Sequence, residues 1–68
     1  MAEKFWFWTW NEGGYNTCWA ACKRDAVDLA KEIALGTVLT PNTSNFKSGP
    51  AAHRATAVAD KYYAGMFD

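Results

Sequence analysis

The chain has 68 residues, and its 7 Lys and Arg residues balance its 7 Asp and Glu residues to a formal net charge of zero. A domain of this size buries only about 60% of the surface that its unfolded chain exposes, so it has little room for an enclosed active site. The balanced charge also lacks the one-sided basic footprint of a protein that neutralises several phosphates. These bounds predict one small domain, residues 1–68, and disfavour both an enzyme and a nucleic-acid binder.

The first predicted element is an aromatic β-hairpin that runs from Lys4 to Ala21. The stretch from Lys4 to Trp10 is rich in aromatic residues, which favour the pleated surface of a strand. Residues 11–14, with the sequence Asn-Glu-Gly-Gly, are a strong turn signal, and the chain returns from Tyr15 as a second strand. If all of residues 11–14 lie in the loop, Trp10 pairs with Tyr15.

That pairing sorts the side chains onto two faces, because neighbours along a strand point to opposite sides. We assign to the core, beneath the first helix, the face with Phe5, Phe7, Thr9, Asn16, Cys18 and Ala20. The opposite face carries Trp6, Trp8, Trp10, Tyr15, Thr17 and Trp19. The assignment depends on the register, since a slip of one residue regroups both faces.

The first predicted helix runs from about Lys23 to Leu35. Its apolar residues at helical spacing are Ala26, Leu29, Ala30 and Ile33. Cys22 occupies the N-cap position, where Ser or Asp is usual, and Gly36 is placed to end the helix. The segment Thr37–Thr40 is β-prone and is a candidate for a short third strand before Pro41.

The remaining sequence predicts a surface loop over residues 41–49, with Phe46 as its anchored residue, followed by a second helix. This helix is predicted from Pro50 to about Ala64, with Gly65 ending it and a tail beyond. Its apolar stripe consists of Ala51, Ala55, Val58 and Tyr62, widened by Ala52, Ala59 and Tyr63. The elements together predict an α+β fold in the order ββα(β)α, in which the third strand is optional.

The Trp-bearing face of the hairpin carries the main functional prediction. Each aromatic side chain removes about 150 to 250 Å² from water when buried, which corresponds to roughly 4 to 6 kcal/mol. Something must therefore cover this face, and either the second helix or a partner protein can do so. The predicted partner-binding residues are Trp8, Trp10, Tyr15, Thr17, Trp19 and Phe46.

Residues with metal or nucleophilic chemistry are few. The set of Cys18, Cys22 and His53 lacks the usual spacings of structural zinc sites, so no metal or cofactor is predicted. Cys22 is a candidate reactive thiol at a helix N-terminus, and a small capping residue is the simpler interpretation. The N-terminal segment lacks the features of a secretory signal, and no apolar run has the length of a membrane span. We therefore expect a cytoplasmic protein.

The stretch from Gly14 to Ala20, followed by Lys23–Lys31, resembles the short hairpin-then-helix proteins that are common among bacteriophage accessory genes. The shared features are the strand, the cap and the Ala-x-x-Leu-Ala helix pattern, and Cys22 departs from the acidic or hydroxyl cap. This resemblance implies a protein that binds and inhibits or modulates a larger host protein, in the host cytoplasm if the chain is phage-encoded. It assigns no functional residue.

Three functions follow as hypotheses. The preferred one is a non-enzymatic binding module whose partner is a larger host protein. The second is a structural or virion-assembly protein that forms a homo-oligomer through its aromatic hairpin face. The third is a single-stranded nucleic-acid binder that stacks bases on its Trp side chains, and it ranks last because the strands carry no basic residue beyond Lys4.

Overall fold

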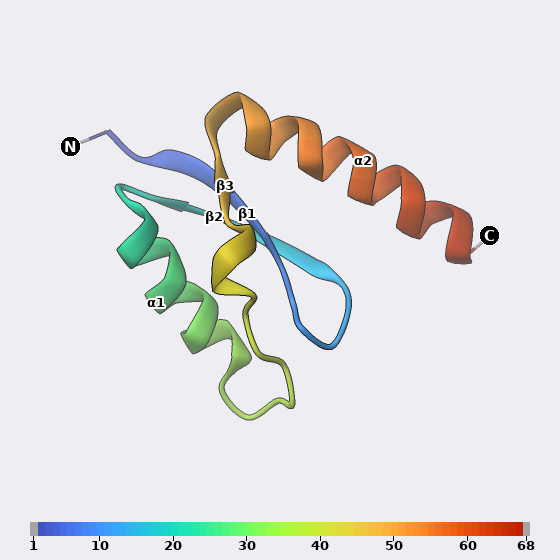
Figure 1. Cartoon of the computed structure of the whole chain (residues 1–68), viewed down its shortest axis with the longest axis horizontal. Helices are drawn as coiled ribbons and strands as arrows, with labels where there is room; N and C mark the ends of the chain where they lie inside the picture. The colour runs from blue at the N-terminus through green and yellow to red at the C-terminus, as the bar shows by residue number, and fades with distance from the viewer. Residues whose placement is uncertain (1, 68) are drawn as a thin grey trace.

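The computed structural model describes the backbone of residues 2–67 and the side chains of residues 2–62. The elements follow in the order β1 (Lys4–Thr9), β2 (Tyr15–Ala20), α1 (Lys23–Ala34), the 3-10 helix η1 (Thr43–Asn45), β3 (Lys47–Ser48) and α2 (Gly49–Phe67). The strands form one antiparallel sheet in the order β2-β1-β3, and α1 and α2 lie on opposite sides of it (Figure 1). The predicted α+β fold is confirmed, with the third strand present.

The hairpin loop is tighter than the sequence analysis predicted. The amide of Gly13 donates to the carbonyl of Trp10 at 3.0 Å, and the amide of Trp10 donates to the carbonyl of Gly14 at 3.1 Å. Gly13 has a φ of 109° and Gly14 a φ of 90°, conformations that only glycine adopts readily. Because these two residues turn the chain early, Thr9 pairs with Tyr15. The predicted pairing of Trp10 with Tyr15 is wrong by one residue.

The change of register regroups the two faces of the hairpin. What we call the Trp face consists of Trp6, Trp8, Trp10, Asn16, Cys18 and Ala20. What we call the Phe face consists of Phe5, Phe7, Thr9, Tyr15, Thr17 and Trp19. The predicted grouping is thus correct within the first strand and wrong for the second, because a slip of one residue exchanges every side chain of one strand between the faces.

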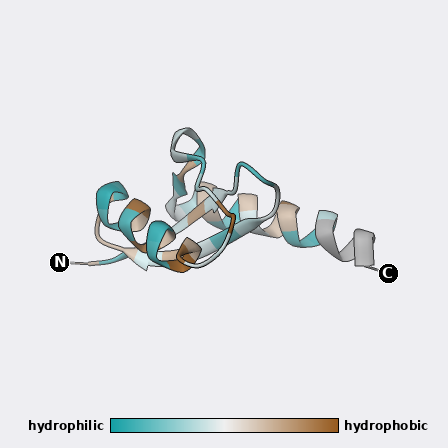
Figure 2. Ribbon diagram, turned by 90° about the horizontal axis from the view of Figure 1, so that it is seen from below, coloured by the Kyte–Doolittle hydropathy of each residue, from teal (hydrophilic) through white to brown (hydrophobic). Residues whose placement is uncertain are grey.

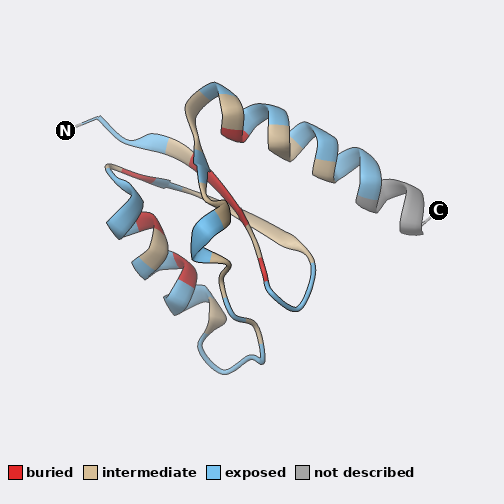
Figure 3. Ribbon diagram, in the orientation of Figure 1, coloured by how far each residue is buried: buried red, intermediate tan, exposed pale blue. Residues whose placement is uncertain are grey.

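The Trp face is covered by α1 and by the chain that follows it. Two buried clusters lie there, namely Trp6 with Ala20 and Ala26, and Trp8 with Trp10 and Ala30. The small side chains of Ala26 and Ala30 let the helix backbone approach the indole rings closely. The buried residues, red in Figure 3, run along β1 and recur on α1. The prediction that the first helix lies on the face with Phe5 and Phe7 is therefore wrong.

The third strand lies later in the chain than predicted. The Thr37–Thr40 segment forms no strand, because the hydroxyl of Thr37 donates to the carbonyl of Ala34 at 2.6 Å and accepts from the amide of Leu39 at 3.0 Å. Such local side-chain bonds compete with the pairing of strands. The chain first reaches the free edge of β1 as an isolated bridge at Pro41, and the two-residue β3 then pairs with β1.

Helix α2 packs on the Phe face and is longer than predicted. It continues through Gly65 to Phe67, so the predicted tail of Met66 and Phe67 is helical. A glycine inside a helix costs only about 1 kcal/mol relative to alanine, which the many Ala residues around it outweigh. Ala52 is buried near the start of α2, and the helix extends past the sheet (Figure 1). Hydrophobic residues in brown tones alternate with hydrophilic residues in teal along α2 (Figure 2). The predicted contribution of Tyr63 to the apolar stripe lies outside the described side chains.

Candidate functional site

The Phe face and α2 form the two walls of an open groove with a volume of about 620 Å³. Helix α2 starts beside β3 and diverges from the hairpin toward its C-terminal end (Figure 1). The sheet contributes Phe7, Thr9, Tyr15 and Lys47 to the lining. Helix α2 contributes Ala51, Arg54, Ala55, Val58, Ala59 and Tyr62. This volume lies within the range of about 300 to 1,000 Å³ that is typical of ligand sites.

The helical wall of the groove follows from the spacing of apolar residues in α2. Residues three and four positions apart share one face of a helix. The predicted stripe of Ala51, Ala55, Val58 and Tyr62 does face one way, and all of its members line the groove. Val58 is 70% exposed and Tyr62 is 65% exposed, so the two largest apolar side chains of this wall meet solvent.

The sheet wall is built from stacked rings. Phe7 is buried and stacks on Tyr15, with ring centroids 5.5 Å apart and an angle of 27° between the planes. Phe5 stacks on His53 of α2 with ring centroids 4.4 Å apart, and this contact helps to hold the start of α2 against the sheet. The ring of Trp19 also packs against Phe5, with ring centroids 5.3 Å apart, and Trp19 is still 57% exposed.

The structure separates the six predicted partner-binding residues into two groups. Trp8 is 0% exposed, Trp10 is buried, and the ring of Phe46 stacks on Trp8 with centroids 5.2 Å apart. These three contact the chain's own core on the Trp face. Trp8 and Trp10 have almost no surface left for a partner, and Phe46 is partly buried. Tyr15, Thr17 and Trp19 lie together on the Phe face, and Tyr15 also lines the groove.

The indole N–H groups of the Trp face show that burial of the rings outweighs hydrogen bonding in this part of the core. Nε1 of Trp6 donates to the carbonyl of Ala20 at 3.0 Å. Nε1 of Trp8 is buried and has no hydrogen-bond partner among the described residues. An unpaired buried donor costs about 1–3 kcal/mol, which is less than a buried indole ring gains from leaving water. Trp8 therefore serves as a packing residue.

Two cationic residues of the groove were missed by the sequence analysis. Lys47 pairs with Phe7 across β1 and β3, and no sequence signal marked that short strand. Arg54 follows the same helical spacing as Ala51 and Val58, so its place in the groove was readable from the stripe already identified. No acidic side chain is among the described residues that line the groove.

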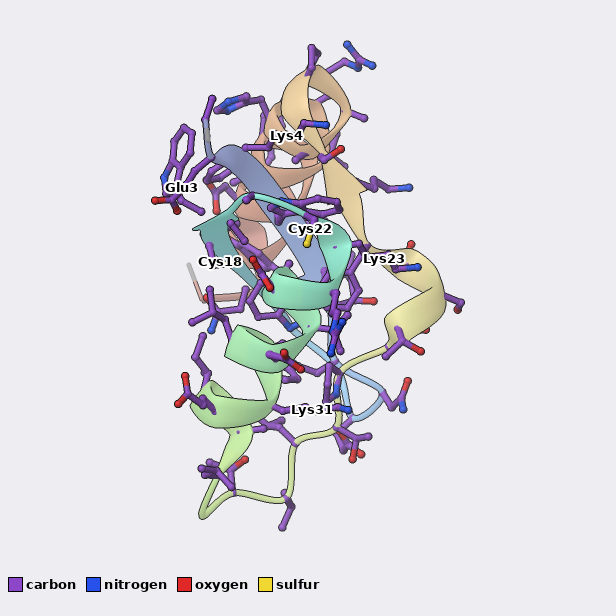
Figure 4. All side chains as sticks on the ribbon, turned by 90° about the vertical axis from the view of Figure 1, so that its left-hand side faces the viewer. Glu3, Lys4, Cys18, Cys22, Lys23 and Lys31 are labelled. Atoms are coloured by element: carbon purple, nitrogen blue, oxygen red, sulfur yellow. The ribbon has the colours of Figure 1, made fainter. Side chains whose placement is uncertain are left out.

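The two cysteines have different surroundings (Figure 4). Cys18 is half-buried on the Trp face, and burial together with the negative charge of Glu3 raises the pKa of its thiol above the ordinary value. Its neutral, less nucleophilic form is thereby favoured. Cys22 is exposed at the N-cap of α1, and its side chain makes no capping hydrogen bond.

Within the part of the chain that the structure describes, no three or more His, Cys, Asp or Glu side chains gather closely enough to hold a metal ion. Neither described helix combines the length and the apolar character needed to cross a membrane.

The fold and the groove together define a small α+β domain with an aromatic core and an apolar surface site. No protein-family model, no curated protein and no solved structure matches this chain.

Proposed function

We propose that this chain is a non-catalytic protein-binding module that takes an apolar segment of a larger protein into the groove between the Phe face and α2. The observation that carries the proposal is the groove of about 620 Å³ lined by Phe7, Tyr15, Val58 and three Ala residues of α2. Clefts of this size with mostly apolar walls are the common form of binding sites.

Exposed aromatic and apolar side chains around the groove support a protein as the ligand. Trp19, Val58 and Tyr62 are each more than half exposed on this side of the molecule. Tyr and Trp are the residues that most often anchor protein interfaces, because they bury a large area and lose little rotamer entropy. A partner that covers these three side chains removes apolar surface from water on both molecules.

The biological role that we attach to this binding activity comes from the resemblance to phage accessory proteins. A module of this kind acts in the host cytoplasm by covering an active or assembly surface of a larger host protein, which inhibits or modulates that protein. Small size suits this role, since a blocker needs a binding surface and no reaction chemistry.

The test uses two exposed valines as a matched pair. Val58 lines the groove and is 70% exposed, whereas Val38 is 86% exposed and lies in the loop after α1, away from the groove. The tagged wild-type chain is used to capture partners from the source cell, and each captured protein is then purified and titrated by calorimetry. We expect Val58→Asp to weaken the Kd of a true partner by about tenfold or more, because the carboxylate loses solvation in an apolar site. Val38→Asp should leave the Kd unchanged.

Equal affinities of the two variants for every captured protein would contradict the groove as the binding site. Light scattering on the wild-type chain checks the self-association alternative. A stable oligomer that Val58→Asp dissociates and Val38→Asp does not would replace the host partner by a second copy of the chain.

A further inference from the structure

The groove has a local excess of positive charge that the chain as a whole lacks. Lys47 and Arg54 both line it, and no Asp or Glu is among its described lining residues. Over the whole sequence the 7 cationic and 7 anionic residues cancel. Neither Lys47 nor Arg54 forms an ion pair with a described residue, so both charges are available to a ligand.

The two cations lie at one end of the groove. Lys47 is in β3 opposite Phe7, and Arg54 is in the early part of α2, close to where that helix leaves β3. Val58 and Tyr62 lie farther along α2, toward the end where the helix and the hairpin diverge (Figure 1). At a rise of about 1.5 Å per residue, Tyr62 is about 12 Å along the helix axis from Arg54. The end of the groove next to β3 is thus basic, and the part lined by Val58 and Tyr62 is apolar.

We propose that the partner segment is an acidic-apolar peptide, whose apolar side chains fill the groove and whose Asp or Glu carboxylate binds Arg54 and Lys47. This inference rests on the proposed function and specifies the partner's chemistry. Arg presents a planar set of donors that suits a carboxylate, and a nearby Lys adds a second charge. Opposite charges at the rim of an interface orient a ligand and raise its association rate.

A single-stranded nucleic acid is the other anionic polymer to consider, and the lining argues against it. Bases bind by stacking on several exposed aromatic faces. Among the described lining residues, Tyr62 is the one aromatic side chain that is largely exposed, Phe7 is buried, and the helical wall consists largely of Ala51, Ala55 and Ala59. Two cations also give little of the phosphate neutralisation on which nucleic-acid affinity depends. Small and aliphatic side chains suit a peptide.

The experiment selects a displayed library of short random peptides on three immobilised proteins. These are the wild-type chain, the double variant Lys47→Glu with Arg54→Glu, and the control Arg24→Glu with Lys61→Glu, which makes the same charge change at exposed positions outside the groove. We expect the wild type and the control to enrich apolar peptides that contain Asp or Glu. The groove variant should enrich apolar peptides that contain Lys or Arg.

Peptides selected on the wild type are then synthesised and titrated. We expect their affinity to fall by about two- to fivefold for each of Lys47→Gln and Arg54→Gln, and this fall should shrink at high salt. If the charge-reversed protein fails to fold, these two neutral variants still test whether the cations bind the peptide. A fall of the same size for Arg24→Gln would overturn the proposal.

The possible failures are distinguishable. Enrichment of apolar peptides with no preference for Asp or Glu, together with lost binding to Val58→Asp, would overturn the acidic-ligand inference and leave the binding module standing. No enrichment on the wild type, or enriched peptides that bind Val58→Asp equally well, would overturn both. Quenching of tryptophan fluorescence by oligo-dT that weakens steeply with salt would replace the peptide by a nucleic acid.

Discussion

The two faces of the hairpin are both aromatic, and they are covered to different extents. On the Trp face, Trp8 is 0% exposed beneath α1, Leu39 and Phe46. On the Phe face, Phe7 is buried while Trp19 is 57% exposed, because α2 packs mainly against β1 and β3 and Trp19 lies on the edge strand β2. Helix α1 follows β2 directly and runs back over the sheet, so its whole length can contribute to the core.

The difference shows that aromatic residues do not mark a binding surface by themselves. Trp8 and Trp10 have the composition of interface anchors and are core residues, because Ala30 of α1 lies against them. The Phe face retains a groove, because α2 packs on the sheet near its start, where His53 stacks on Phe5, and diverges from the hairpin farther along. Whether an aromatic side chain is buried or available to a partner depends on how closely the covering helix packs against its face. Substitutions on the two faces can test this difference.

The largest expected effect is the loss of Trp8 compared with the loss of Trp19. Trp8→Ala should lower the free energy of unfolding by about 3–5 kcal/mol, since it empties a fully buried site. Trp19→Ala should lower it by less than about 1 kcal/mol, since the ring is already largely in water. Urea unfolding followed by far-UV circular dichroism measures both. Similar losses in the two variants would show that the faces are equally buried.

Enlarging an alanine under each helix should have opposite consequences. Ala30 is fully buried against Trp8 and Trp10, so Ala30→Leu should destabilise the fold by about 1–3 kcal/mol through overpacking. Ala55 lines the groove, where an added side chain meets open space, so Ala55→Leu should leave stability unchanged or raise it slightly. Thermal unfolding of the two variants measures the difference, and a destabilised Ala55→Leu would mean that the groove is closed in solution.

A substitution at the N-terminus of α1 should have a smaller effect, and it should stabilise the fold. Cys22 has the extended backbone of an N-cap residue, with φ −151° and ψ 170°, but its side chain makes no capping hydrogen bond. Cys22→Ser should raise the free energy of unfolding by about 1 kcal/mol, because the hydroxyl accepts a bond from a free amide of the first turn. Cys22→Ala is the control and should give no gain. A gain of equal size from alanine would point to the loss of the thiol as the cause.

The smallest expected effect concerns Cys18 and alkaline pH. Burial and the charge of Glu3 raise the pKa of the Cys18 thiol above its ordinary value, so the folded state disfavours the thiolate. The resulting stabilisation is complete below the ordinary thiol pKa and is lost as the pH rises through the folded value. Iodoacetamide reacts with the thiolate, which the folded state disfavours at Cys18. Alkylation followed by mass spectrometry should therefore show slower modification of the half-buried Cys18 than of the exposed Cys22. Equal rates would show that the Trp face is open to solvent.

Local sequence signals were sufficient for the elements and for part of the site. The aromatic strand, the glycine turn, and the Ala and Leu spacing before Gly36 each predict their element, because strand, turn and helix preferences act over a few residues. The stripe of Ala51, Ala55, Val58 and Tyr62 was likewise readable, and it forms the helical wall of the groove.

Only the tertiary structure decided what covers the aromatic hairpin. The hairpin loop is one residue shorter than predicted, because Gly13 and Gly14 adopt positive φ. The side chains of β2 therefore lie on the opposite faces from those that the sequence analysis assigned to them. The hydrogen bonds of Thr37 hold residues 37–40 out of the sheet. The third strand forms instead at Lys47 and Ser48, where Lys47 lines the groove. Register and helix placement depend on contacts between residues far apart in the chain. For that reason the sequence alone determined that the hairpin needs covering, and the fold determined which face remains partly open.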